Sequence, residues 1–135
     1  MEEQTLILVK PDGVSRGHIG EVITRLEDRG FTIEQLKVVH ATLEQLKQHY
    51  ADKLDAPYFG HIVAYMQEGP LVAIVASGTH IVDTFHRMAG KTNPFDAQPG
   101  TIRADFGREW PDGQIRNVVH SSDSPEAAQH EINTV

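Results

Sequence analysis

Residues 5–9 read Thr-Leu-Ile-Leu-Val, an unbroken run of apolar and β-branched side chains near the start of the chain. A run of this length without polar alternation is typical of a strand that is buried on both faces of a sheet. Residues 10–13, with the sequence Lys-Pro-Asp-Gly, are turn formers that end the strand. A second run of the same kind, Leu-Val-Ala-Ile-Val-Ala at residues 71–76, predicts another buried strand. The fold is therefore expected to contain a well-covered sheet.

Helix and turn signals fill the rest of the chain. Apolar residues at three- and four-residue spacing from Ile19 to Leu26 predict a helix that stops at Gly30. Thr42 and Gln45 form the pattern of a capping box, which opens a helix through about Tyr50. The remaining predicted elements are strands over 31–40 and 117–120, helices over 58–67 and 81–90, and a last helix over 125–132 with Ser124 as its N-cap.

The order of these elements is β-α-β-β-α-β, with added helices between the second and third strands. This order predicts an α/β (α+β sandwich) protein of the ferredoxin-like type, with a four-stranded antiparallel sheet and helices on one face. Residues 91–116 are rich in proline and glycine and lack periodicity, so we expect a long irregular loop before the last strand. Such loops usually serve binding. The length of 135 residues predicts a single domain over residues 1–135.

Composition narrows the class of function. There are no cysteines, which excludes disulfides, zinc-thiolate sites and thiol catalysis and agrees with a reducing cytoplasm. The acidic N-terminus is no signal peptide, and no apolar run has the roughly 18 residues that a membrane span needs. A formal net charge of −7 argues against general nucleic-acid binding. Arg87, Lys91, Arg103, Arg108 and Arg116 nevertheless cluster in the chain, as either a small-polyanion site or a solvated face.

His120 ends a predicted strand and precedes the small polar residues 121–124, with the sequence Ser-Ser-Asp-Ser. A histidine held this way, with room for a ligand, suggests a nucleophile or an acid/base group. The alternative is a structural histidine that caps this turn. A nucleophile needs its opposite ring nitrogen held, and Glu131 could do this if the last helix folds back. Otherwise Glu131 is a solvent-facing residue near a helix end.

Other candidates remain open from spacing alone. Lys10 either extends to solvent or faces a site, and Tyr50 and Tyr58 are either core aromatics or pocket residues. Residues 90–92, Gly-Lys-Thr, resemble the end of a P-loop, but Phe85 stands where its first glycine should be. No motif for a tightly held metal is present. Four of the eight histidines are expected at the surface: His49, His61, His80 and His130.

Six separated stretches resemble nucleoside diphosphate kinase and occur in the order of that family over nearly the whole chain. The most specific are His120-Ser121-Ser122-Asp123-Ser124 and the upstream Pro99-Gly100-Thr101-Ile102-Arg103. The resemblance implies transfer of the γ-phosphate of a nucleoside triphosphate, mainly ATP, to a nucleoside diphosphate by a ping-pong mechanism. The six stretches are residues 8–14, 49–50, 57–59, 90–94, 99–105 and 117–124.

The resemblance also implies residue roles. His120 would carry the phosphate on Nδ1, and Glu131 would orient its ring. Mg²⁺ would arrive with the nucleotide, bridging its phosphates. Because neutral imidazole is the attacking form, activity should fall below about pH 6.5. The other roles are phosphate binding by Lys10, Arg103 and the Thr92 hydroxyl, bonding of the sugar 3′-hydroxyl by Asn117, support by Tyr50 and Ser122, base stacking by Tyr58, and an apolar neighbour at Ile62.

The chain departs from the family pattern at His86, where a phosphate-binding arginine is usual. Arg87 is next to it, but neighbouring helical positions point about 100° apart. We therefore expect either a weaker contact from His86 or a shifted helix that lets Arg87 reach the phosphate. Residues 105–117 also look longer than in many members, and no extended tail follows Val135.

Several interpretations stay open beside the kinase. A homo-oligomer is expected, with a hexamer as the family default and a tetramer or dimer possible. A catalytically weak ferredoxin-like nucleotide-binding or regulatory module is the alternative function, and a phosphohistidine carrier for another protein is a third. The expected partners are ATP and other nucleoside di- and triphosphates, with no membrane and no specific nucleic acid, in the cytoplasm.

Overall fold

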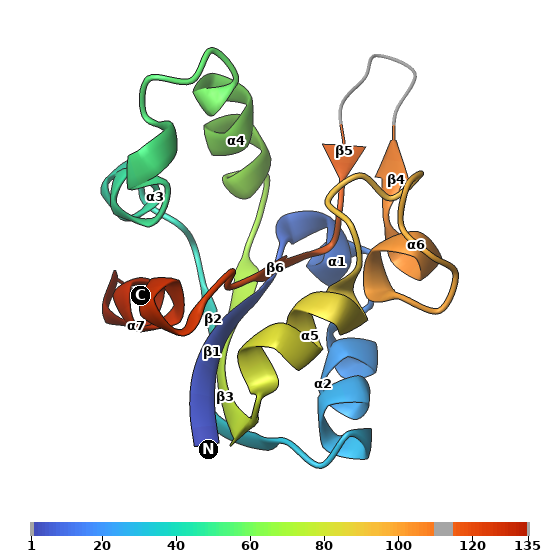
Figure 1. Cartoon of the computed structure of the whole chain (residues 1–135). Coiled ribbons are helices and arrows are strands. Elements are labelled where there is room, and N and C mark those ends of the chain that lie inside the picture. The colour runs from blue at the N-terminus through green and yellow to red at the C-terminus, as the bar shows by residue number, and fades with distance from the viewer. Residues whose placement is uncertain (1, 110–114, 135) are drawn as a thin grey trace.

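The computed structural model describes residues 2–109 and 115–134, and its centre is a four-stranded antiparallel sheet. The strand order is β2-β3-β1-β6, which is the ferredoxin-like order expected from the sequence (Figure 1). The two runs that predicted buried strands form β1 (Glu2–Val9) and β3 (Leu71–Thr79), and all of β1 pairs with residues 72–79 of β3. The outer strands are β2 (Thr32–Val39) and β6 (Val119–Ser121).

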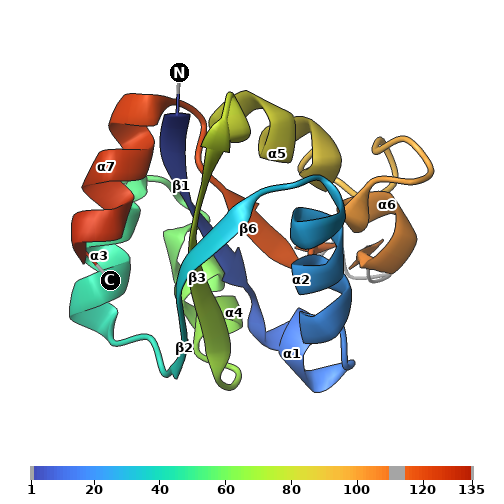
Figure 2. The ribbon, with the colours of Figure 1, turned by 90° about the horizontal axis from the view of Figure 1, so that it is seen from below.

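Helices cover both faces of this sheet, so the expectation of helices on one face was wrong (Figure 2). On one face, α2 (Ile19–Asp28) and α5 (Ile81–Ala89) pack on residues such as Ile7 and Ile74. The other face carries α3 (Leu43–His49), α4 (Phe59–Met66) and α7 (Pro125–Thr134). Two apolar clusters follow from the unbroken apolar sequence of β1, because its alternate side chains point to opposite faces.

The helix ends follow the local sequence. Thr42 and Gln45 form the predicted capping box at the start of α3. The Ser124 hydroxyl accepts a hydrogen bond from the Ala127 N–H at 3.1 Å, as an N-cap does. A short 3-10 helix, η1 (Ala51–Lys53), continues from α3. None of the helices in the described parts of the chain is long and apolar enough to span a membrane.

The proline- and glycine-rich segment is more ordered than its composition suggested. It contains α6 (Ile102–Phe106), whose first turn is capped by the Thr101 side chain, and a small hairpin of β4 (Arg108–Glu109) and β5 (Ile115–Arg116). The expected irregular loop over residues 91–116 was therefore wrong in part, because a capped turn can form without apolar periodicity. Within the stretch over residues 105–117, residues 110–114 lie outside the described residues.

Strand β6 begins later than predicted, because Val118 has a φ of 70°. A β-branched residue in this left-handed region carries strain of roughly 1–3 kcal/mol. Its side chain is fully buried in the core, and that burial offsets the cost. The first turn of α1 (Pro11–Ser15) rests against it: a Cβ on Gly13 would lie 3.0 Å from Val118 Cγ1. Gly13 therefore allows the chain after β1 to approach β6.

Candidate active site

The register of β1 against β6 brings Lys10 and His120 to the same end of the sheet. His120 pairs with Leu8, and the Lys10 N–H donates to the Val118 carbonyl at 2.7 Å. The Lys10 ammonium donates to Asn117 Oδ1 at 2.8 Å. Lys10 and Asn117 are both buried. The strained residue Val118 thus lies in the chain between Asn117 and His120, two residues that the sequence placed in one site.

His120 is held by Glu131 from the helix that follows it, α7. His120 Nε2 lies 2.8 Å from Glu131 Oε1, and the Ser122 hydroxyl donates to the same oxygen at 2.6 Å. An ionised carboxylate only accepts hydrogen bonds, so the proton of the neutral imidazole sits on Nε2. Nδ1 is left with a lone pair, which is the arrangement that a nucleophilic histidine needs.

Burial sets the charge state of this pair. It lowers the pKa of His120 below its ordinary value, although Glu131 works in the opposite direction. Burial disfavours the charged form of Glu131 too, but the hydrogen bonds from His120 and Ser122 outweigh it and lower the pKa of that carboxyl. The neutral form of the His120 imidazole is therefore favoured down to a lower pH than in a free histidine.

Two buried cationic side chains, Arg103 and Lys10, line the same cavity as His120. Arg103 of α6 donates from its guanidinium to the carbonyls of Gly90 and Val119, each at 2.8 Å, while its buried Nε finds no hydrogen-bond partner in the part of the chain that the structure describes. Burial, followed by the charge of Arg103, lowers the pKa of Lys10 to about 7. His120, Lys10 and Arg103 all line one cavity of about 400 Å³.

A second cavity of about 590 Å³ continues from the first. Both share Lys10, Tyr50, Lys53, Thr92 and Asn117 in their walls. Tyr58 and Ile62, from the start of α4, line only the second cavity, and the Tyr58 side chain is half exposed. Burial raises the pKa of Tyr50, so its hydroxyl stays protonated. In the combined cleft, the buried Lys10 and Arg103 line the cavity of His120, and the aromatic ring of Tyr58 lines the second cavity.

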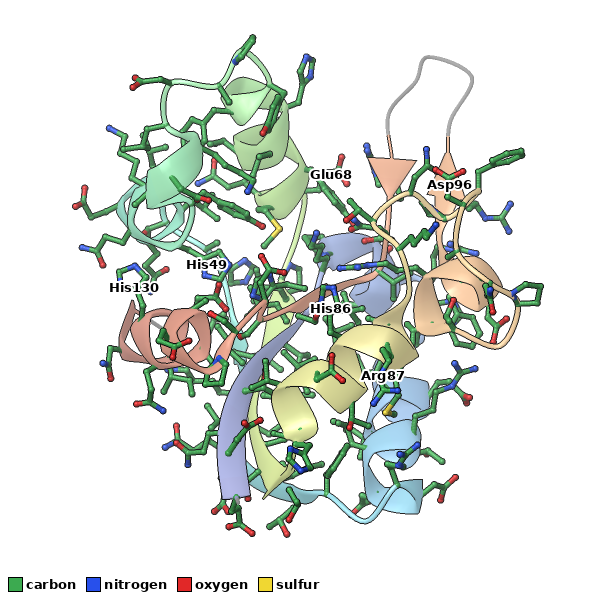
Figure 3. The ribbon with its side chains drawn as sticks, in the orientation of Figure 1. His49, Glu68, His86, Arg87, Asp96 and His130 are labelled. Carbon is green, nitrogen blue, oxygen red and sulfur yellow. The ribbon has the colours of Figure 1, made fainter. Side chains whose placement is uncertain are left out.

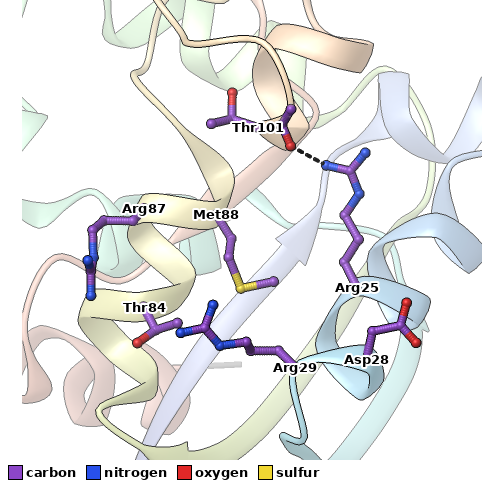
Figure 4. A pocket seen from close by; sticks show the side chains of 8 residues that line it. Arg25, Asp28, Arg29, Thr84, Arg87, Met88 and Thr101 are labelled. Carbon is purple, nitrogen blue, oxygen red and sulfur yellow. Dashed lines mark hydrogen bonds between the residues drawn. The ribbon is translucent and has the colours of Figure 1, made fainter.

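The two residues proposed for the missing arginine lie in different places. His86 lines the cavity of His120, and its Nδ1 lies 2.9 Å from the Ser121 hydroxyl oxygen and 3.8 Å from Asp123 Oδ1. Arg87 pairs with Asp83 at 3.1 Å and lines a separate cavity of about 460 Å³ between α2, α5 and the chain before α6 (Figure 4). Helix α5 is therefore not rotated in a way that brings Arg87 to the cleft.

Comparison with known proteins identifies the chain. A family model described as nucleoside diphosphate kinase matches residues 3–135. The chain belongs to the nucleoside diphosphate kinase family. A nucleoside diphosphate kinase of Streptococcus agalactiae (serotype III, strain NEM316) is 52% identical over 131 residues, which cover 96% of this chain and 95% of that protein. One from Columba livia is 50% identical, with 97% and 83% covered.

Solved structures of the family agree with this fold. A nucleoside diphosphate kinase from Aquifex aeolicus superposes with a TM-score of 0.92 at 36% identity, covering 99% of this chain and 94% of that one. A halophilic nucleoside diphosphate kinase from Halobacterium salinarum, solved in complex with CDP, gives 0.90 at 36% identity, with 99% and 87% covered. The chain is thus a phosphotransferase that moves a phosphate from a nucleoside triphosphate to a nucleoside diphosphate.

One histidine next to this kinase site was missed from the sequence. His49 (labelled in Figure 3) was expected at the surface, but its ring packs edge-on against that of His120, with 4.5 Å between the ring centroids. Burial, followed by the charge of His120, lowers the pKa of His49 to about 3. A signal was present: His49 follows the buried Leu46 by three residues and therefore lies on the same face of α3.

A hydrogen-bonded pair beside the cleft, Tyr65 and Asp12, was also missed from the sequence. The Tyr65 hydroxyl donates to Asp12 Oδ1, and the buried Asp12 Oδ2 has no hydrogen-bond partner within residues 2–109 and 115–134. The Tyr65 ring lies 5.3 Å from the Lys10 ammonium. Asp12 acts to raise the pKa of Lys10 against the effects of burial. Asp12 therefore helps to keep the cleft lysine charged.

Proposed function

We propose that His120 carries the phosphate between the two half-reactions of a ping-pong mechanism. The observation that carries the proposal is the hydrogen bond from Nε2 to Glu131, at 2.8 Å, which leaves the Nδ1 lone pair available. Nδ1 forms a bond to the γ-phosphorus while the bond from that phosphorus to the bridging oxygen breaks. The nucleoside diphosphate leaves with that electron pair, and a second nucleoside diphosphate takes the phosphate by the reverse step.

The protein's part in this transfer is positioning and electrostatic stabilisation. As the ring gains positive charge, the Glu131 carboxylate stabilises it through Nε2–H, and the Ser122 hydroxyl fixes the carboxylate. Lys10 and Arg103 bind the moving oxygens. Supporting roles fall to the hydroxyls of Tyr50 and Thr92, to Asn117 at the sugar 3′-hydroxyl, and to His86 as a phosphate contact.

The proposed cofactor is Mg²⁺ brought by the nucleotide. The shared walls of the two cavities hold a buried lysine and an amide side chain at Lys10 and Asn117, and Mg²⁺ prefers carboxylate, phosphate and water oxygens. The nucleotide phosphates are therefore its main ligands. When bound there, Mg²⁺ neutralises charge on the phosphate oxygens.

The proposed nucleotide position places the base at Tyr58 and Ile62 and the phosphates at His120. The Halobacterium salinarum relative binds CDP, which supports a nucleotide in this cleft. Stacking on an aromatic face is tolerant of the base, so we expect broad use of nucleoside di- and triphosphates, with ATP as the main donor.

Labelling tests this function directly. Incubation with Mg²⁺ and γ-labelled ATP should give an acid-labile, base-stable label on the protein, and added GDP should discharge it. His120→Gln should take no label, whereas His40→Gln, an exposed control, should be labelled fully. Label that nucleotides do not discharge would favour a carrier for another protein. Absence of label on the unmodified chain would favour a regulatory module and refute the proposal.

We also propose a homo-oligomer in the cytoplasm. Strand β2 is at the edge of the sheet and exposes Leu36 at 45% and Val38 at 63%. Apolar side chains on an open edge support pairing with another copy. A hexamer is favoured, with a tetramer or dimer possible, and light scattering after gel filtration would distinguish these sizes.

A further inference from the structure

His120 belongs to a cluster of three metal-ligating side chains, and its Nε2, which the transfer does not use, faces Glu131 in that cluster. One ligand atom from each of His49, His120 and Glu131 lies within 4.8 Å of the other two. His49 Nε2 is buried and has no hydrogen-bond partner among the described residues. A buried, unpaired ring nitrogen has lost its bond to water without gaining another. A ligand that accepts its lone pair would relieve this cost.

We propose that His49, His120 and Glu131 form an inhibitory site for a zinc-type divalent cation, with Zn²⁺ as the best fit. Two imidazole nitrogens and one carboxylate oxygen are a known ligand set for zinc, with solvent in the fourth position. Bonds of roughly 2.0–2.1 Å place tetrahedral ligand atoms about 3.3 Å apart. His120 Nε2 and Glu131 Oε1 are already 2.8 Å apart. Contraction of the remaining separations from at most 4.8 Å to about 3.3 Å would close the site around a cation.

The surroundings favour metal binding in two further ways. Metal-bound histidines must be neutral, and burial lowers the pKa of His49 to about 3, so its ring is neutral at physiological pH. Ligating carboxylates are usually fixed by a further hydrogen bond, and the Ser122 hydroxyl supplies one to Glu131 at 2.6 Å. Lys10 and Arg103 line the same cavity and oppose any added positive charge. This opposition favours a cation that forms strong bonds to nitrogen over one held mainly by charge.

Inhibition follows from the tautomer of His120 and rests on the proposed function. In the metal-free protein the ring proton is on Nε2, and Nδ1 attacks. A cation on Nε2 takes that lone pair, and the proton moves through solvent to Nδ1, so that no proton is gained or lost. An Nδ1 that carries a proton has no lone pair for the phosphorus. Mg²⁺ prefers oxygen ligands and should not compete for this site.

Metal binding to the nucleotide-free protein, without an affinity tag, tests the proposal. Cobalt(II) serves as a coloured substitute for zinc, and its visible absorption should rise on binding and be displaced by Zn²⁺. His49→Gln should weaken zinc affinity by more than about tenfold, since even an outer-shell change costs about 10- to 100-fold. His130→Gln is the matched control: His130 lines the same cavity, is exposed, and should leave zinc affinity unchanged.

Nitrogen NMR of the unmodified protein keeps the test independent of any variant. Zinc should move the His120 proton from Nε2 to Nδ1, and labelling by Mg²⁺·ATP should stop until a zinc-selective chelator is added. Unchanged zinc affinity in a folded His49→Gln, or a proton that stays on Nε2 with zinc present, would overturn the proposal. Failure of the proposed function looks different: no label would form at position 120 in zinc-free buffer, while cobalt would still bind.

Discussion

Replacing Glu131 with glutamine isolates the charge of the carboxylate that holds His120. Glutamine keeps an oxygen that can accept from Nε2–H, and it keeps nearly the same size. The carboxylate oxygen accepts from both His120 and Ser122, at 2.8 and 2.6 Å. What the variant loses is the stabilisation of the positive charge that develops on the imidazole as Nδ1 attacks.

The size of the effect follows from the type of hydrogen bond. A bond to a charged group contributes about 1.5–3 kcal/mol, and a neutral one about 0.5–1.5 kcal/mol. The difference of about 1–1.5 kcal/mol corresponds to a loss of roughly 5- to 12-fold in the rate of phosphorylation. Glu131→Ala removes the whole interaction and should lose about 2–3 kcal/mol, or roughly 30- to 150-fold.

Rapid-quench measurement of the first half-reaction at saturating Mg²⁺·ATP is the appropriate assay, because it reports the chemical step alone. Glu126→Gln, an exposed glutamate in the first turn of the same helix, is the control and should stay within about twofold of the unmodified protein. The reasoning would be refuted if both Glu131 variants phosphorylated within twofold of the original rate. It would also be refuted if only the nucleotide KM changed, because the proposed contact acts on the imidazole and not on the nucleotide.

Three further predictions concern the cleft. His86→Ala should raise the nucleotide KM by about 2- to 10-fold through loss of one hydrogen bond to phosphate. Arg87→Ala should leave this KM unchanged, since Arg87 lines another cavity. The opposite pattern would show that α5 has a different orientation. Tyr58→Ala should raise the nucleotide KM by about fivefold or more through lost stacking, to a similar extent for purine and pyrimidine nucleotides. An effect on the nucleotides of one base alone would contradict stacking. In a profile of kcat/KM against pH, the fall on the acid side should lie at a lower pH than for an ordinary histidine, because burial lowers the pKa of His120. The profile should also fall as pH rises through about 7, where Lys10 loses its charge, and Lys10→Arg should move this alkaline fall to higher pH.

The strands and their order could be predicted because burial on both faces leaves an unmistakable run of apolar residues in β1 and β3. Helix α6 could not, since its five residues are held by the Thr101 cap and by packing of Ile102 into the core. The start of β6 was also missed, because the left-handed backbone of Val118 opposes the normal preference of valine. It exists only because Gly13 and the core hold that residue in place.

The site could be predicted where a buried residue shows which face of a helix points inward, because residues three or four positions apart share that face. Glu131 follows the buried Ala128 by three residues, so it lies on the inward face of α7 and reaches His120. The same rule applied to Leu46 would have placed His49 inward, but its position at the end of a short helix resembled a surface residue. The choice between His86 and Arg87 needed the orientation of α5 relative to the sheet, which no local pattern specifies.

The partners of the basic residues explain how an acidic chain can bind phosphate. With a formal net charge of −7, phosphate is repelled overall, so the cleft depends on cations whose charge is not already neutralised. Lys10 donates to an amide oxygen and Arg103 to two backbone carbonyls, so neither forms a salt bridge within the described residues. Both have lost hydration by burial, and their pKa values are lowered for that reason. A bound phosphate would stabilise the charged forms of both side chains and so offset the cost of burying them. This stabilisation contributes to nucleotide binding. Three other arginines are instead held in salt bridges: Arg25 with Glu21 and Asp105, Arg87 with Asp83, and Arg116 with Glu68.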